Sequence, residues 1–450
     1  MAADAGSETV PQAIPLAMAL RYWLKLGFIS FGGPAGQIAL MHQELVGRRR
    51  WISERRFLHA LNYCMVLPGP EAQQLATYIG WLMHRTLGGI AAGTLFVLPS
   101  LLMLIVLSWI YAAYGQVPAV AGIFFGIKPA VTALVVQAAL RIGARALRNA
   151  ALWAVAAAAF VAIFFFNAPF PVIVAAAALI GLAGGRYAPG RFELGGADRA
   201  AQRSYGPALI DDDTPTPAHA QFRWGRLARV VAGGAALWVA PMASLVADFG
   251  WGHPLTQMAW FFTKAALLTF GGAYAVLPYV NQGAVGRYHW VTPAQMIDGL
   301  GLGETTPGPL IMVVAFVGFL GGYGRALFGP DRLFLAGAAA ACLVTWFTFL
   351  PSFIFILAGG PLVEATHDDL KFTAPLTAIT AAVVGVILNL ALFFGYHVLW
   401  PDGFGGRFDL TSAALAAAAA VALIRFKVNV IHLIAACAAL GLVFRLIHMA

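Results

Sequence analysis

Four short glycine- and proline-rich motifs have the residue types and spacing that favour ligand binding in this sequence. They are Phe31-Gly32-Gly33, Pro68-Gly69-Pro70, Phe270-Gly271-Gly272 and Pro307-Gly308-Pro309. Gly and Pro together stop helices, so each motif interrupts the apolar segment that contains it. A helix that restarts after such a break presents unpaired N–H groups and about half a positive charge. That chemistry suits a small anion.

Charged side chains near these motifs would add to such a site. Lys25 and Lys264 precede the two glycine pairs, and lysines at membrane depth are usually functional or paired. The alternative is that both side chains snorkel to the membrane surface. Glu71 follows the first PGP motif and Glu304 precedes the second. A desolvated carboxylate there would couple proton entry to anion exit, whereas Glu71 would equally serve as a partner of the helix dipole.

The predicted site follows the motifs through both halves of the chain. The predicted anion-binding residues are Lys25, Ser30, Phe31, Gly32, Gly33, Pro68, Gly69, Pro70, Lys264, Thr269, Phe270, Gly271, Gly272, Thr305, Thr306, Pro307, Gly308 and Pro309. The proton-coupling candidates are Glu71 and Glu304, and the secondary candidates are Arg21, Asn62, Gln73, Gln74 and Lys128. Alternatives exist for each residue type. Single glycines would also be explained by close helix crossings, the phenylalanines would pack in the core, and the amides would form hydrogen bonds between helices.

The elements that must position these residues are membrane helices. Of the 450 residues, 60% are hydrophobic and 10% are charged, whereas soluble proteins carry about 25% charge. This composition excludes an ordinary soluble enzyme. Runs of about 20 apolar residues are long enough to cross a bilayer, and they predict spans at 86–114, 117–142, 149–166, 170–186, 226–248, 330–358, 372–397, 409–424 and 428–447.

Residues 15–47 and 55–84 differ from these spans because a motif interrupts each of them. Each arm is too short to cross alone, which predicts discontinuous or re-entrant helices whose bare backbone faces protein or a water-filled cavity. Whether residues 15–47 and 254–286 cross or re-enter is open in the sequence. We favour re-entry for the first, which places the N-terminus in the cytoplasm. No cleaved signal peptide is expected, because residues 1–12 lack a basic region.

The motifs recur because the chain is a tandem duplication. A shift of 239 residues superimposes FGG on FGG and PGP on PGP, and Leu98-Pro99-Ser100 matches Leu350-Pro351-Ser352 at a shift of 252. The loops of the first half are rich in arginine, and the corresponding loops of the second are poor in it. The positive-inside rule therefore predicts halves of opposite orientation, and it explains the net charge of +9 without nucleic acid. Inverted repeats are typical of secondary transporters.

The predicted fold class is an all-α polytopic membrane protein with two inverted repeats. Its expected parts are an N-terminal tail (1–14), a first repeat (15–186), a polar cytoplasmic linker (187–222), a connecting helix (223–250) and a second repeat (251–450). No catalytic residue, metal or cofactor is expected, because the sequence contains no nucleotide-binding, hydrolase or metal-ligand motif. A membrane enzyme or scaffold is the less favoured alternative.

The order of these motifs resembles the chromate ion transporter family. The resemblance is carried by residues 31–38, 48–53 and 67–76, and again by residues 269–274, 290–292 and 303–309. It implies a long-chain, two-domain protein of the bacterial inner membrane. Such a protein would export chromate, driven by the membrane potential or a proton gradient, and so confer chromate resistance. The expected partners are chromate, protons and the lipid bilayer, a homodimer is one assembly considered, and sulfate is the alternative substrate.

Overall fold

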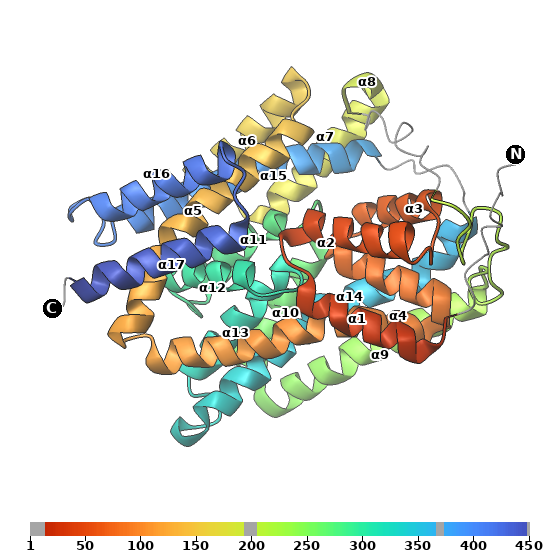
Figure 1. Cartoon of the computed structure of the whole chain (residues 1–450), viewed down its shortest axis with the longest axis horizontal. Helices are drawn as coiled ribbons and strands as arrows, with labels where there is room; N and C mark the ends of the chain where they lie inside the picture. Colours follow the sequence, from red (N-terminus) through yellow and green to blue (C-terminus); the bar gives the residue numbers. More distant parts are fainter. Residues whose placement is uncertain (1–13, 193–204, 366–372, 448–450) are drawn as a thin grey trace, which may run out of the picture.

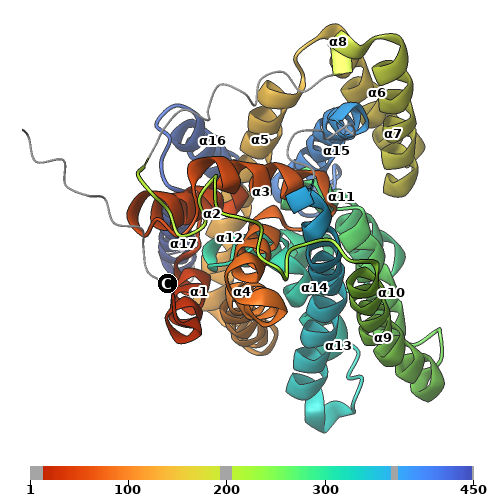
Figure 2. The ribbon, with the colours of Figure 1, turned by 90° about the vertical axis from the view of Figure 1, so that its right-hand side faces the viewer.

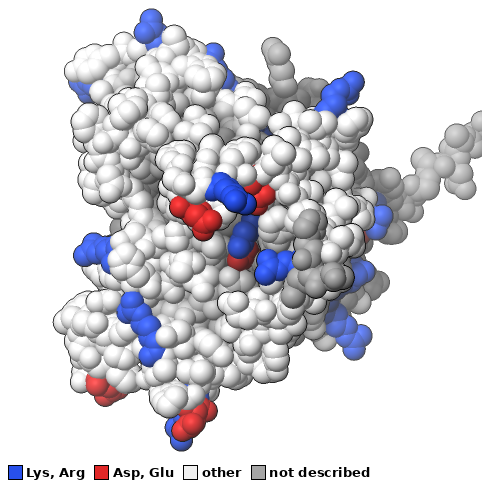
Figure 3. Space-filling view, turned by 90° about the vertical axis from the view of Figure 1, so that its left-hand side faces the viewer, with Lys and Arg blue, Asp and Glu red and all other residues white. Residues whose placement is uncertain are grey.

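The computed structural model describes residues 14–192, 205–365 and 373–447, and these fold almost entirely into helices (Figure 1). Within these ranges the β-structure is one isolated bridge, between Ile52 and Ile210. Seven of the described helices are long and apolar enough to cross a membrane. On the face shown in Figure 3 most of the surface is uncharged, with one group of acidic and basic side chains near the centre and further charged side chains around the edges. The expected all-α polytopic membrane fold is confirmed.

The first half of the chain contains the broken segments followed by long apolar helices. Its elements are α1 (Leu16–Ile29), α2 (Gly33–His42), η1 (Gln43–Arg48), α3 (Glu54–Val66), α4 (Glu71–Tyr114), α5 (Pro118–Ala146), α6 (Ala150–Phe166), α7 (Phe170–Tyr187) and α8 (Pro189–Phe192). The helices begin and end within a few residues of the predicted spans. The breaks between α1 and α2 and between α3 and α4 coincide with the FGG and PGP motifs.

The second half repeats this order after a connecting helix. Its elements are α9 (Trp224–Phe249), α10 (Pro254–Leu267), α11 (Ala273–Asn281), η2 (Gln282–Arg287), α12 (Pro293–Thr305), η3 (Leu310–Met312), α13 (Val313–Gly324), η4 (Pro330–Arg332), α14 (Leu333–Ala365), α15 (Thr373–Leu399), α16 (Leu410–Ile424) and α17 (Val430–Ile447). Figure 2 shows α9 at the edge of the molecule beside α10 and α14. The predicted tail over 1–13 and linker residues 193–204 lie outside the described residues.

Helix α4 is two antiparallel arms. The backbone turns at His84 and Arg85, and φ of Arg85 is 58°. The arms then pack so closely that a Cβ on Gly80 would lie 2.6 Å from the carbonyl oxygen of Gly88. In the second half, separate helices α13 and α14 make the same close contact, since a Cβ on Gly318 would lie 2.9 Å from the carbonyl oxygen of Ala340.

The broken segments of the first half enter and leave at one end of the molecule, where the described linker (205–222) lies. Two helix pairs have both of their ends there: the α1–α2 pair, and the pair formed by α3 and the first arm of α4. The N–H of Leu209 in the linker donates to the carbonyl of Arg50 after α2 (2.9 Å), and Nε2 of His219 in the linker bonds the carbonyl of Trp81 at the end of the first arm of α4 (2.9 Å). Nε2 of His84, beside that arm, bonds the carbonyl of Ile14 before α1 (2.8 Å). Each pair is therefore a hairpin with its break at the inner tip.

Helix α9 carries the chain from the linker end to the opposite end. Its 26 residues span about 39 Å at 1.5 Å per residue, which exceeds the hydrocarbon thickness of a bilayer, about 30 Å. The α10–α11 and α12–α13 hairpins start after this crossing, and Arg325, beyond α13, donates a hydrogen bond to the carbonyl of Tyr288 beyond η2 (2.5 Å). Opposite membrane orientation of the halves stays a prediction, and this geometry supports it.

Candidate anion site at the helix breaks

The inner tips of the four hairpins meet in two reciprocal pairs. The backbone N–H of Gly308 donates to the carbonyl of Ser30 (2.8 Å), and the N–H of Gly69 donates to the carbonyl of Thr269 (2.7 Å). Each donor is the central residue of a PGP motif, and each acceptor directly precedes the FGG motif of the other half. The same shift of 239 residues relates the two bonds, so the structure joins the four predicted motifs in two equivalent pairs, each with one motif from either half.

The central glycines of the PGP motifs are required by conformation and space. Gly69 has φ of +131° and Gly308 has φ of +104°, a region that side chains of L-residues rarely adopt. A Cβ on Gly308 would lie 2.7 Å from the Cβ of Ser100. A Cβ on Gly69 would collide with the hydroxyl of Ser352. No other residue fits either tip without displacing its neighbours.

Ser100 and Ser352 face these glycines and occupy equivalent places in the duplicated LPS motifs. Both side chains are fully buried, and neither hydroxyl has a hydrogen-bond partner in the described structure. Buried polar groups are nearly always satisfied, so these two hydroxyls beside the tips are available to bind water or a ligand. A hydroxyl can donate to an oxyanion. The sequence analysis matched the LPS motifs but did not include their serines among the candidates.

Three buried glutamines surround the same tips. Gln37 donates through Nε2 to the Gly308 carbonyl (2.5 Å), and Gln74 donates to the Pro68 carbonyl (2.8 Å). Gln73 lies one residue before Gln74, and the Oε1 atoms of all three are buried without a partner. An amide oxygen only accepts hydrogen bonds, so these atoms suit water or a protonated oxyanion. Gln73 and Gln74 were secondary candidates, and Gln37 was missed because its partner is 271 residues away.

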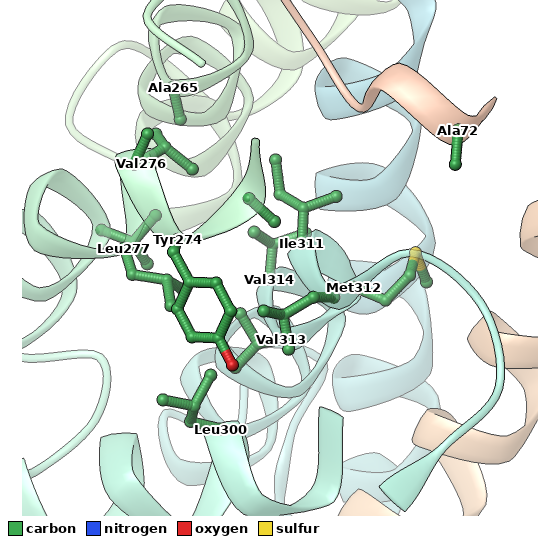
Figure 4. Packing of buried hydrophobic residues seen from close by; sticks show 14 of the residues in the cluster. Ala72, Ala265, Tyr274, Val276, Leu277, Leu300, Ile311, Met312, Val313 and Val314 are labelled. Atoms are coloured by element: carbon green, nitrogen blue, oxygen red, sulfur yellow. The ribbon is translucent and has the colours of Figure 1, made fainter. Parts of the chain in front are cut away.

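New helices start directly after the motifs. Helix α4 begins at Glu71 and η3 at Leu310, after the PGP motifs, while α2 and α11 begin at Gly33 and Ala273. Figure 4 shows Ile311 and Met312 of η3 packed near Tyr274 of α11, with Ala72 at the start of α4 on the far side of Met312. The unpaired N–H groups of these first turns are the donors that an anion needs.

Several predicted hydroxyl donors are already used by their own helices. The side chains of Ser30 and Thr269 donate to the carbonyls of Leu26 (2.6 Å) and Ala265 (2.7 Å). Those of Thr305 and Thr306 donate to the carbonyls of Leu302 (2.9 Å) and Gly303 (3.2 Å). These residues contribute to the tips through backbone geometry. Phe31 and Phe270 are half-buried beside the tips.

The two lysines of the predicted site lie on the outer faces of their helices. Lys25 is exposed between Leu24 and Phe28, which are themselves 40% and 52% exposed. Lys264 is half-buried, and its Nζ lies 5.4 Å from the centre of the Trp260 ring. The structure does not bring either ammonium group to the breaks. The secondary candidates Arg21 and Asn62 are also exposed.

The two candidate carboxylates differ in their surroundings. Glu71 is half-buried in the first turn of α4, directly after the tip that contains Gly69. Glu304 is buried near the end of α12 and accepts a hydrogen bond from the hydroxyl of Tyr274. Among the described residues no three His, Cys, Asp or Glu side chains form a group that would hold a metal.

Comparison with known proteins identifies the family. The model of the chromate transporter family matches residues 18–182 and 256–442, which cover both halves and leave the linker and the whole of α9 between them. The chain belongs to the chromate transporter family. It is similar to the chromate transport protein of Pseudomonas aeruginosa, with 34% identity over 86% of this chain and 82% of the relative.

Two further relatives extend this likeness. The chromate transport protein of Cupriavidus metallidurans is 26% identical over 99% of this chain and 97% of its own length. The probable chromate transport protein of Synechococcus elongatus is 26% identical over 87% of each chain. No solved structure matches the chain. The protein is a multi-pass membrane transport protein of this family.

In this member of the chromate transporter family, Lys128 is paired. Its Nζ lies 3.5 Å from Oδ2 of Asp298, which also accepts a hydrogen bond from Tyr111 (2.8 Å). Asp298 is buried and was not among the predicted residues. Its position within the apolar segment 293–305 could have pointed to it, because a charge at membrane depth usually has a partner of opposite sign. At the linker end, Glu364 and Arg56 form a second pair (3.3 Å).

Proposed function

We propose that this protein carries chromate out of the cytoplasm across the bacterial inner membrane and so confers chromate resistance. The observation that supports this most is the reciprocal meeting of the four tips, with two unsatisfied serine hydroxyls beside them. Backbone N–H groups and the hydroxyls of Ser100 and Ser352 would hold the oxyanion between the PGP motifs. Membership of the chromate transporter family supports chromate as the substrate.

The proposed site is built from neutral donors. Helix N-termini and hydroxyls stabilise a dianion through partial charges, and the proposed donors include no lysine or arginine side chain. The ammonium groups of Lys25 and Lys264 lie outside this site, and Lys128 is neutralised by Asp298. Such a site suits transport, because an ion that must leave on the far side cannot be bound too tightly.

The membrane potential is sufficient to drive export. Moving one elementary charge across a membrane at 100 mV changes its free energy by about 2.3 kcal/mol, so a dianion gains about 4.6 kcal/mol on leaving a negative interior. Export therefore does not require proton coupling. The carboxylate of Glu71 would repel a dianion at the start of α4, so protonation of Glu71 would strengthen chromate binding.

Chromate flux into inside-out proteoliposomes tests the proposal. We expect the purified protein to carry chromate inward with respect to the vesicle, and the double variant Ser100→Ala/Ser352→Ala to bind chromate at least about 100-fold more weakly. Each hydrogen bond to a charged group contributes about 1.5–3 kcal/mol, and two are lost. Ser244→Ala is the matched control, because this hydroxyl is exposed on α9.

Sulfate is the competitor that decides specificity. If an equal concentration of sulfate abolishes chromate flux and is itself carried faster, the protein is a sulfate carrier. If no chromate flux is found, the proposal is wrong. Unchanged chromate binding in the double serine variant would show that the tips are not the binding site, without contradicting chromate transport itself.

A further inference from the structure

A groove on the outer surface lies between the second arm of α4, helix α9 and helix α14. Its volume is about 730 Å³, within the range of roughly 300–1,000 Å³ that is usual for ligand sites. Its lining runs from Thr86 to Leu101 on α4 and from Cys342 to Leu357 on α14. None of the lining residues belongs to the proposed anion site, so the groove requires an occupant of a different kind.

The walls of the groove have the chemistry and length of a lipid acyl chain. They are mostly aliphatic and aromatic, with Ile90, Leu98 and Phe349 among the residues that line them. The lining covers 16 residues on α4 and 16 on α14, and the 15 steps between the first and last residue correspond to about 22 Å at 1.5 Å per residue. One leaflet of a bilayer supplies about half of a 30 Å hydrocarbon core plus its headgroup region. A single acyl chain with its headgroup therefore matches the length of the groove.

Two arginines close one end of the groove. Arg226 and Arg229 stand in the first turns of α9, next to the linker. Their guanidinium groups donate to the carbonyls of Gln221 (3.5 Å) and Gly225 (3.1 Å). No carboxylate is paired with either arginine among the described residues. Two positive charges above an apolar groove complement a phosphate attached to an acyl chain, and basic pockets between membrane helices bind anionic lipids in this way.

The glycines of α9 keep the groove open. A Cβ on Gly234 would lie 2.6 Å from the side chain of Ile354, so the two helices touch at this position. Gly233 also lines the groove, and a Cβ there would meet nothing within 4 Å. A bulky residue at 233 would therefore enter the space of the groove, while the contact at 234 remains.

We propose that this groove binds an anionic phospholipid, with its acyl chain between α4, α9 and α14 and its phosphate on Arg226 and Arg229. The lipid fills the space between α9, the second arm of α4 and α14, and so fixes the position of a helix that otherwise has few buried residues. This inference rests on the groove and its charges and does not depend on which anion the protein transports.

Native mass spectrometry of the full-length protein in detergent tests the proposal by titration with phosphatidylglycerol and phosphatidylcholine of the same acyl chains. We expect about 30-fold tighter binding of phosphatidylglycerol, from roughly 1 kcal/mol for each of two arginines near an anionic group. Arg226→Gln/Arg229→Gln should lose this preference. Arg186→Gln/Arg191→Gln should keep it, because these arginines are exposed and lie outside the groove.

A second variant separates the acyl groove from the arginines. Gly233→Phe should reduce binding of both lipids at least tenfold, because its ring occupies the acyl position. Equal affinity for the two lipids in the unchanged protein would overturn the proposal, as would a preference that survives in Arg226→Gln/Arg229→Gln. Displacement of the lipid by inorganic phosphate alone at millimolar concentration would also overturn it, since the groove would then contribute nothing.

Discussion

Alanine at Gly308 is the substitution that tests the tip geometry most sharply. It keeps the backbone N–H that donates to Ser30, so it changes only conformation and space. The φ of +104° costs about 1–3 kcal/mol for a residue with a side chain. The new methyl group would lie 2.7 Å from the Cβ of Ser100, and overpacking of this kind costs about 1–3 kcal/mol more. The expected loss of stability is therefore about 2–6 kcal/mol.

Thermal unfolding in detergent and chromate flux per molecule measure the consequence. We expect Gly308→Ala to lower the melting temperature by several degrees and to reduce flux strongly. Gly286→Ala is the matched control, because a Cβ there meets nothing within 4 Å and the backbone is not left-handed. Gly308→Ala/Ser100→Gly should recover part of the lost thermal stability, since it removes the overlap between the two side chains but leaves the backbone strain. If Gly308→Ala behaves like Gly286→Ala, the tip geometry is not required.

Three further predictions concern charges. Lys128→Met should destabilise the protein by about 3–5 kcal/mol, because it leaves the buried carboxylate of Asp298 without its partner. Asp298→Asn should cost less, because the Lys128 side chain is 31% exposed and water can solvate its charge. The double variant should recover most of the loss caused by Lys128→Met, and additive losses in thermal unfolding would contradict the pairing. We expect chromate binding to strengthen on acidification, and Glu71→Gln should abolish this effect. Glu44→Gln, at a surface ion pair with Arg48, should retain it. An identical pH dependence of chromate binding in both variants would exclude Glu71 as the group that takes up the proton. Burial lowers the pKa of His219 below its usual 6.5, so its contribution to stability is present above that pH and lost below it. The melting temperature should therefore fall more between pH 7.5 and 5.5 in the unchanged protein than in His219→Gln, and equal falls would contradict this.

Local patterns were enough to predict the helices and their interruptions. Apolar runs indicate a span wherever they occur, so α5, α6 and α7 begin and end close to the predicted residues. Gly and Pro act on their immediate neighbours, which is why the breaks at Gly32 and Gly69 were predicted from sequence alone. The prediction of a site with residues from both halves followed from the duplication, which places equivalent breaks in each half.

Contacts between distant residues were beyond the sequence. That Ser30 meets Gly308, or that Lys128 meets Asp298, depends on how hairpins pack, and no local pattern encodes this packing. The outward position of Lys25 likewise follows from which face of α1 is buried. The LPS motifs offered a usable signal, because a small polar residue duplicated within two apolar spans is costly unless it has a partner. The sides of the membrane and the boundaries of the repeats stay predictions.

The central claim is that the four helix breaks form the anion site. Anomalous scattering from chromium in crystals soaked with chromate locates the ion directly. The account predicts one peak between the PGP tips, within hydrogen-bonding distance of Ser100 or Ser352 and of the first backbone N–H groups of α4 or η3. A peak at Lys25, Lys128 or Lys264, with none at the tips, would contradict it.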